Sequence, residues 1–211
     1  MSKPNVIVYV LTGIERHDWL SPWLCIALLR LQQDSRFDLS IHMADHPFRV
    51  EHARNMCVAD ARERGAAAMC MIDNDNVPPY NFGDILHDAI STRKAVVMLS
   101  YGVFLHGAGG PEIIPGDNGP KEGNFRVTGC AGTGVTILSS EVWRVLPRGP
   151  WFKWLTNDDE MQSRQLGEDY YFCELVQQHG MKVWTHHYAR AGHLKTWNVT
   201  GMAALRKPLT T

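Results

Sequence analysis

The stretch that decides the fold is GAAAMCMIDNDNVPP, residues 65–79. Small and apolar residues fill positions 66–72, the polar triplet Asp73-Asn74-Asp75 follows directly, and two prolines come soon after. A short apolar run of this kind is typical of a strand that is buried on both faces of a sheet. Polar side chains at the end of such a strand lose solvation energy unless something binds them. The stretch therefore predicts a buried strand that ends in a ligand-binding turn.

Composition places the chain among soluble globular proteins. It has 211 residues, of which 45% are hydrophobic and 20% are charged. This length is enough for one domain with a substantial core. The formal net charge of -1 gives no electrostatic argument for a protein that binds nucleic acid through its phosphates.

The cysteines and the N-terminus indicate a reducing compartment. Five cysteines lie far apart, mostly in apolar runs, and form no CxxC pair, which favours buried free thiols over disulfides or a zinc site. The apolar run near the N-terminus is interpreted as a first strand and not as a signal peptide. We find no segment long and apolar enough to cross a bilayer, so the expected location is the cytoplasm.

The first hundred residues alternate between strand and helix patterns. Strands are expected at 6–11, 37–44, 66–72 and 94–102, and helices at 21–33, 50–65 and 81–92. Ser21 and Pro22 are suited to begin the first of these helices, and Gly65 is suited to end the second. This alternation predicts an α/β fold with a mostly parallel central sheet flanked by helices.

The second half of the sequence does not continue this alternation of strand and helix patterns. Residues 105–124 contain six glycines and three prolines, which predicts a long loop without regular structure. The segment 125–140 is interpreted as a pair of strands interrupted by glycines. A polar loop is expected at 156–166, followed by a helix that ends at Gly180 and a last strand at 181–187.

Asp73 and Asp75 are the first candidates for chemistry. Ligands of open α/β sheets bind beyond the carboxyl ends of the strands, which is where these residues are expected. Two carboxylates in an oxygen-rich site suit Mg²⁺ or Mn²⁺. The alternative is a simple turn, because Asp, Asn and Pro are all turn formers.

Three further residues complete the set of candidates. Glu168 and Asp169 come at the start of a predicted helix, where a carboxylate either acts as a general base or simply stabilises the helix dipole. His193 follows the last predicted strand, but the chain has ten histidines. His186 and His187 compete with His193 for any role.

The order of these motifs resembles that of a known enzyme family. ARNMCVADARERGAAAMCMIDNDNVPP (53–79), GCAGTGVTILSSEVW (129–143), GEDYYFCELVQQHGMKVWTHH (167–187) and GH (192–193) follow one another as in GT-A glycosyltransferases, especially small family-2-like members. The resemblance covers about residues 50–193. It implies a metal-dependent transferase that moves a sugar from a nucleotide-diphosphate sugar to an acceptor hydroxyl.

The resemblance assigns a donor site to the polar turn. Asp73 and Asp75 would bind Mn²⁺ or Mg²⁺, directly or through water, and His193 would complete the metal site. The metal would bridge the diphosphate of the nucleotide sugar, with UDP as the favoured nucleotide.

The same resemblance places further residues around the donor and the acceptor. Arg54 and Asn55 would lie near the nucleotide or the strand that ends in the Asp-Asn-Asp triplet, Asn74 would bind the nucleotide, and Thr12 and Glu15 would belong to its binding edge by position. A solvated helix face is the alternative for Arg54.

Catalysis would fall to the Glu-Asp pair. Asp169 would be the general base, giving inversion at the anomeric carbon, and Glu168 would support the acceptor or orient the site. Gly132 and Gly134 would let the backbone approach the sugar, or would relieve a bulge.

A single GT-A-like domain, 1–211, is expected on this basis. Residues 1–101 would form the nucleotide-binding half, and 102–211 the acceptor and catalytic half with mobile loops at 105–124 and 156–166. Trp151, Trp154 and Trp197 are candidates for stacking on sugar or base, or for the core.

Two other functions remain open. One is a nucleotidyltransferase, and the other is a non-catalytic module that binds nucleotide sugars. For a transferase, the acceptor stays open among a saccharide, a protein, a small molecule and a modified DNA base, and so does the oligomeric state.

Overall fold

A computed structural model describes residues 2–12, 20–45, 49–104, 111–114, 119–155 and 167–193. The helices in these ranges are α1 (Pro22–Gln32), α2 (Val50–Glu63), α3 (Phe82–Ser91), α4 (Ser140–Val145) and α5 (Glu168–Gln178). The strands are β1 (Asn5–Thr12), β2 (Asp38–Asp45), β3 (Ala68–Asp73), β4 (Asn76–Val77), β5 (Val96–Met98), β6 (Tyr101–Phe104), β7 (Pro111–Ile114), β8 (Lys121–Glu122), β9 (Phe125–Thr128), β10 (Val135–Ser139), β11 (Val183–His186) and β12 (Gly192–His193).

The large sheet has the order β2-β1-β3-β10-β5-β11-β9-β8. Its parallel pairs are β2–β1, β1–β3 and β5–β11. The pairs β3–β10, β10–β5, β11–β9 and β9–β8 are antiparallel, so among the described strands the expectation of a mostly parallel sheet was wrong. The physical reason is that parallel neighbours need a crossover connection, usually a helix, and the described residues between β5 and β10 contain strands but no helix.

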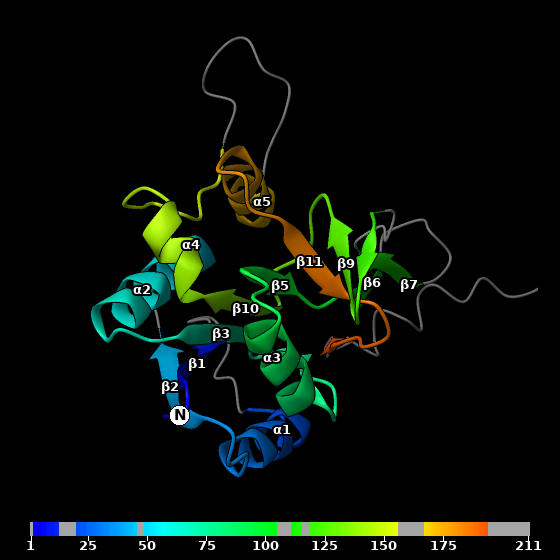
Figure 1. The fold of residues 1–211 in the computed structure, drawn as a ribbon. Coiled ribbons are helices and arrows are strands. Elements are labelled where there is room, and N and C mark those ends of the chain that lie inside the picture. The colour runs from blue at the N-terminus through cyan, green and yellow to red at the C-terminus, as the bar shows by residue number, and fades with distance from the viewer. Residues whose placement is uncertain are drawn as a thin grey trace, which may run out of the picture.

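Helices cover both faces of this sheet (Figure 1). β1 shows the division, because Ile7, Tyr9 and Leu11 face one core and Val6, Val8 and Val10 face the other. The first core is closed by α2, α4 and α5, and the second by α1 and α3. The continuous apolar run of β3 fits this position between two layers, since its residues 68–72 are all buried.

Local signals at the helix ends are confirmed. Ser21 caps α1 by accepting a hydrogen bond from the Leu24 N–H at 3.0 Å, and Pro22 is the first helical residue. Gly65 follows the end of α2 with φ +63°, and Gly180 follows the end of α5 with φ +76°. Both glycines adopt the left-handed conformation in which a side chain is strained.

Several expectations for the second half need correction. Residues 105–124 contain regular structure, because β7 pairs with β6 and β8 pairs with β9. The strand expected at 94–102 is divided between β5 and β6. β9 and β10 both form, but β9 pairs with β11 and β10 inserts between β3 and β5. The loop expected at 156–166 lies outside the described residues.

All five cysteines are free; Cys57, Cys70 and Cys173 are buried as expected, whereas Cys25 and Cys130 are partly exposed. Among the described residues, no helix has both the length and the apolar character that a membrane span requires.

Packing beneath α5 fixes the helix that carries Glu168 and Asp169. Phe172 is fully buried, and its ring stacks on Phe152 with 4.3 Å between the ring centres and 15° between the planes. We expect Phe172→Ala to lower the free energy of unfolding by about 3–5 kcal/mol, because it removes a large buried ring and leaves a cavity. Urea denaturation measures this change.

Tyr170, a half-exposed neighbour on the same helix, provides the control. Tyr170→Ala should change the free energy of unfolding by no more than about 0.5 kcal/mol. Equal losses for the two variants would contradict the packing described here.

Candidate active site

A buried arginine joins the polar turn to the Glu-Asp helix. Arg54 is only 2% exposed, although it carries a positive charge. Its Nη2 lies 3.0 Å from both carboxylate oxygens of Asp73, and its Nη1 lies 2.6 Å from Glu168 Oε1. Three elements, α2, β3 and α5, therefore meet at one guanidinium. We call Arg54, Asp73 and Glu168 the Arg54 cluster.

The sequence explains why these three side chains converge. Arg54 belongs to the buried face of α2, together with Ala53, Cys57, Val58 and Ala61. This face packs on the sheet beside β3, and Asp73 is the last residue of that strand. Glu168 is the first residue of α5, which covers the same side of the sheet. The alternative of a solvated helix face for Arg54 is wrong.

Burial makes the charges of the cluster depend on one another. Burial alone would lower the pKa of Arg54, but the carboxylates of Asp73 and Glu168 outweigh it and raise the pKa above its usual value. Burial raises the pKa of Glu168, the charge of Arg54 opposes this shift, and the charge of Asp169 adds to it. An arginine that stays charged here requires its carboxylate partners.

A second polar group lies directly after the Asp-Asn-Asp triplet. Asn76 is 2% exposed and its Nδ2 donates to Asp75 Oδ1 at 2.8 Å. Its Oδ1 is buried and has no hydrogen-bond partner within the described part of the chain. A Cβ on Gly134 would lie 2.7 Å from both polar atoms of this amide, so glycine makes room for it. Our sequence reasoning missed Asn76, although the polar run visibly extends to it.

His193 is brought near this point by the backbone. β12 pairs with β4 so that His193 is the register partner of Asn76. Within the described ranges, no group of three or more His, Cys, Asp or Glu side chains is arranged to hold a metal ion, and the side chain of His193 lies outside what the structure describes. The role of His193 as a metal ligand stays a prediction.

The competing histidine His186 has a structural role. Its Nδ1 accepts hydrogen bonds from the backbone N–H groups of Tyr188 and Ala189, at 3.3 and 2.9 Å. Its ring meets Phe125 edge-on, with 5.6 Å between the ring centres. Burial lowers the pKa of His186, which favours the neutral ring that this turn requires.

The expected nucleotide edge is only partly described. Leu11 and Asp73 are register partners, so Thr12 follows at the same edge of the sheet as the polar turn. The N–H of Asn74 donates to the Leu11 carbonyl at 3.1 Å. Glu15 lies outside the described residues. Contact of Thr12 and Asn74 with a nucleotide stays a prediction.

Asn55 holds a loop in place. Its Oδ1 accepts from the N–H groups of Trp151 and Phe152, at 2.7 and 3.0 Å. Its Nδ2 donates to the carbonyls of Glu51 and Phe152, at 2.8 and 2.7 Å. These four bonds use the two acceptor sites and two donor hydrogens of the amide. The structure therefore gives Asn55 a positioning role, and its place near a nucleotide stays a prediction.

Asp169 lies next to the Arg54 cluster in the first turn of α5. It is partly exposed, and its Oδ1 accepts from the N–H of Tyr170 at 2.9 Å. The Asp169 Oδ1 and the Trp154 ring lie 3.0 and 3.8 Å, respectively, from the position where a Cβ on Gly167 would be. Asp169 therefore combines partial exposure with an aromatic neighbour.

The candidate tryptophans differ in exposure. Trp151 is 5% exposed and its Nε1 donates to the Pro147 carbonyl at 2.9 Å. It therefore belongs to the core and is not a surface for stacking on a sugar or base. Trp154 is 45% exposed. Trp197 lies outside the described residues.

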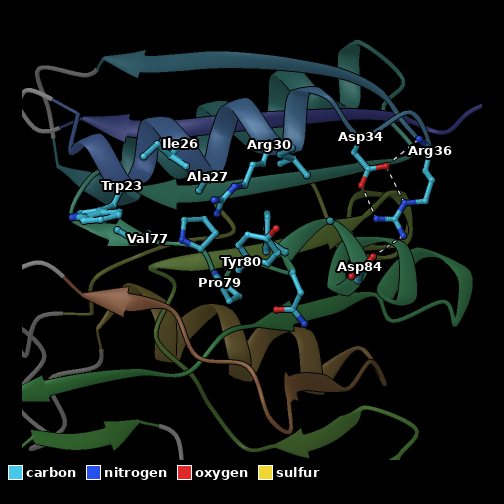
Figure 2. Close-up of a pocket in the computed structure, with 15 residues that line it drawn as sticks. Trp23, Ile26, Ala27, Arg30, Asp34, Arg36, Val77, Pro79, Tyr80 and Asp84 are labelled. Atoms are coloured by element: carbon cyan, nitrogen blue, oxygen red, sulfur yellow. Dashed lines mark hydrogen bonds and ion pairs between the residues drawn. The ribbon is translucent and has the colours of Figure 1, made fainter.

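A separate groove of about 340 Å³ lies between α1 and the segment from β4 to α3 (Figure 2). The guanidinium of Arg30 lies 4.2 Å from the ring centre of Tyr80. Arg36 pairs with Asp84 at 2.9 Å on the same wall. The residues that line this groove include no member of the Arg54 cluster, and within it Arg36 forms ion pairs with Asp34 and Asp84. We therefore place the candidate chemistry at the cluster.

Comparison with known proteins gives structural likeness without sequence likeness. No protein-family model matches the chain, and no curated protein matches its sequence. A197 from STIV, a viral protein, matches with a TM-score of 0.61 and 16% identity over 91% of this chain and 86% of A197.

A second similar structure is GalNAc-T7, a GT-A glycosyltransferase, in a crystal structure with UDP, GalNAc and Mn²⁺. It matches with a TM-score of 0.56 and 11% identity over 93% of this chain, which spans 45% of GalNAc-T7. At these identities the likeness concerns the fold alone. The mixed α/β architecture, with a large sheet flanked by helices, is consistent with a GT-A-like fold.

The buried arginine gives a direct prediction about stability. Arg54→Met leaves the carboxylates of Asp73 and Glu168 without their cation, so near pH 7 the free energy of unfolding should fall by about 3–5 kcal/mol. Chemical denaturation measures the change. Arg64→Met removes a surface ion pair with Asp60 at the end of the same helix, and should leave the unfolding midpoint nearly unchanged.

The deficit of Arg54→Met should shrink as the pH falls. Arg54 lowers the pKa of Glu168, so its removal raises the pKa of Glu168 further in the folded state. The folded variant then binds a proton at higher pH than folded wild type, and its relative stability rises as the pH falls through that pKa. A deficit that stays constant between pH 7.5 and 5 would contradict this explanation.

Gly134 gives a prediction about the polar turn. Gly134→Ala places a methyl group against the Asn76 amide and should cost about 1–3 kcal/mol of stability. Gly129→Ala is the matched control, because a Cβ there meets no atom within 4 Å. In an Asn76→Ala background the cost of Gly134→Ala should largely disappear. A full cost in both backgrounds would mean that the methyl group clashes elsewhere.

Proposed function

We propose that the protein is a metal-dependent glycosyltransferase that moves a sugar from a nucleotide-diphosphate sugar, with UDP as the favoured nucleotide, to an acceptor hydroxyl. The observation that carries this proposal is the Arg54 cluster, which joins the end of β3 to the start of α5. It puts an Asp-Asn-Asp turn and a Glu-Asp pair within one site. The fold likeness to GalNAc-T7, whose crystal structure contains UDP and Mn²⁺, supports the same reading.

The oxygen donors at the polar turn suit a hard divalent cation. Asp75 supplies a carboxylate, and the neighbouring Oδ1 of Asn76 is buried without a hydrogen-bond partner among the described residues. Asp75 and His193 would hold Mn²⁺ or Mg²⁺, and Asp73 would contribute through water because Arg54 contacts both of its oxygens. When bound, such a cation neutralises negative charge on a departing diphosphate.

The two carboxylates of α5 would divide their roles by environment. Glu168 is buried and paired with Arg54, which suits a residue that orients the site. Asp169 is partly exposed beside Trp154, which suits a residue that meets an acceptor. Asp169 would take the proton of the acceptor hydroxyl as its oxygen attacks the anomeric carbon. A base opposite the leaving group gives inverted configuration.

The donor site is tested by ligand binding. UDP and UDP-sugars, each with Mn²⁺ or with a chelator, should raise the melting temperature of the protein only when Mn²⁺ is present. Ligand at ~100 times its dissociation constant stabilises the folded state by about 2.7 kcal/mol. Asp75→Ala should remove this shift. Mn²⁺-dependent stabilisation that survives Asp75→Ala would contradict the assignment of the metal.

The base is tested by activity. Asp169→Asn keeps the shape of the side chain but cannot accept the acceptor proton, so transfer should fall by about 10²–10⁴-fold. Nucleotide binding measured by calorimetry should stay close to that of wild type. Near-full transfer by Asp169→Asn would exclude this residue as the base. Nucleotide-sugar binding by wild type without hydrolysis or transfer would favour a non-catalytic module.

A further inference from the structure

An open groove of about 370 Å³ is lined by Arg49, Val50 and Glu51, at the start of α2, and by Trp154. Its volume lies within the ~300–1,000 Å³ that is usual for small-molecule sites. Glu51 precedes Arg54 by three positions on α2, so the two side chains lie on neighbouring turns of the same helix. The groove is therefore continuous with the elements that build the candidate active site.

The position of Trp154 ties this groove to the proposed base. The ring edge of Trp154 and the carboxylate of Asp169 both lie within 4 Å of the position that a Cβ on Gly167 would occupy. Asn55 fixes the loop that presents Trp154, through its bonds to Trp151 and Phe152. A half-exposed aromatic ring thus has a fixed position beside a carboxylate.

Glu51 carries a polar atom that lacks a partner. Its Oε2 is buried and forms no hydrogen bond within the described residues. A buried acceptor without a donor destabilises the folded protein. A ligand hydroxyl donating to this oxygen would relieve that destabilisation.

These features fit the chemistry of a sugar ring. An aromatic face accepts the C–H face of a pyranose, and a carboxylate and a guanidinium bind its hydroxyl groups. A nucleotide diphosphate fits less well, because Arg49 and Glu51 both line the groove and together offer it no net positive charge.

We propose that this groove is the acceptor subsite and that the acceptor is a saccharide. Trp154 stacks on the sugar ring, Glu51 Oε2 accepts a hydrogen bond from one of its hydroxyls, and a second hydroxyl reaches Asp169. In the transfer step, which rests on the proposed function, that hydroxyl loses its proton to the Asp169 carboxylate. Its oxygen forms the new bond to the anomeric carbon, and the bond to the diphosphate breaks with its electron pair on the leaving oxygen.

The test separates saccharide binding from donor chemistry. Saturation-transfer NMR with the full chain and a panel of methyl hexopyranosides and disaccharides measures saccharide binding without any donor. Binding of UDP with Mn²⁺ by wild type is measured in parallel and reports the proposed function alone. Wild type should bind at least one saccharide of the panel, and Trp154→Ala should weaken that binding by at least ~10-fold.

Matched variants make the test specific. Trp154→Phe keeps an aromatic face and should retain most of the affinity, whereas Glu51→Gln should weaken it. Trp23→Ala removes a tryptophan that is also well exposed, in the groove beside α1, and should have no effect. The melting temperature of each variant shows that it is folded.

The outcomes differ for the two proposals. Saccharide binding that depends on Trp154 supports the subsite even if UDP does not bind, in which case the proposed function fails alone. Wild type that binds UDP with Mn²⁺ but no saccharide overturns the subsite and leaves the proposed function standing. Equal saccharide affinity for wild type and a folded Trp154→Ala variant also overturns the subsite.

Discussion

The buried charge of Arg54 is the constraint on which the rest of the site depends. A guanidinium taken out of water is costly unless carboxylates lie in hydrogen-bonding contact with it. Asp73 and Glu168 provide that contact at 3.0 and 2.6 Å, from segments almost one hundred residues apart in the sequence. The ion pairs hold the end of β3 and the start of α5 against α2, so they fix the distance between the polar turn and the Glu-Asp pair. Phe152 links α5 to α2 as well, because its ring packs on Phe172 and its backbone is hydrogen-bonded to Asn55.

Much of this arrangement could be predicted from the sequence. The apolar run before Asp73 predicted a strand buried on both faces, and the caps at Ser21, Gly65 and Gly180 marked helix ends because each has a local cause. The antiparallel insertion of β10 could not be predicted, because pairing between distant strands leaves no local pattern. The burial of Arg54 could not be predicted either, because it depends on two ion-pair partners that other elements contribute. Asn76 was missed because its importance comes from Gly134, which leaves room for its amide only in the folded sheet.

The fold likeness and the chemistry of the site do not support the functional proposal equally. Likeness to A197 and to GalNAc-T7 concerns the arrangement of sheet and helices, and one fold can host unrelated functions. The functional proposal therefore depends on the site itself. Within it, the carboxylates of Asp73 and Glu168 pair with Arg54 and stabilise the geometry, whereas the partly exposed Asp75 and Asp169 are placed for chemistry. Trp154 and Glu51 are suited to an acceptor, because they combine an aromatic face with a carboxylate oxygen that has no hydrogen-bond donor among the described residues.

The central claim is that the turn after β3 holds a divalent cation and a nucleotide diphosphate beside the Arg54 cluster. Anomalous diffraction at the manganese edge, from crystals grown with Mn²⁺ and UDP, tests it most directly. We predict a manganese peak in contact with Asp75 and His193, with the diphosphate bound to the same ion and Arg54 still paired with Asp73 and Glu168. UDP bound elsewhere, or manganese absent from this turn at saturating concentrations, would contradict the claim.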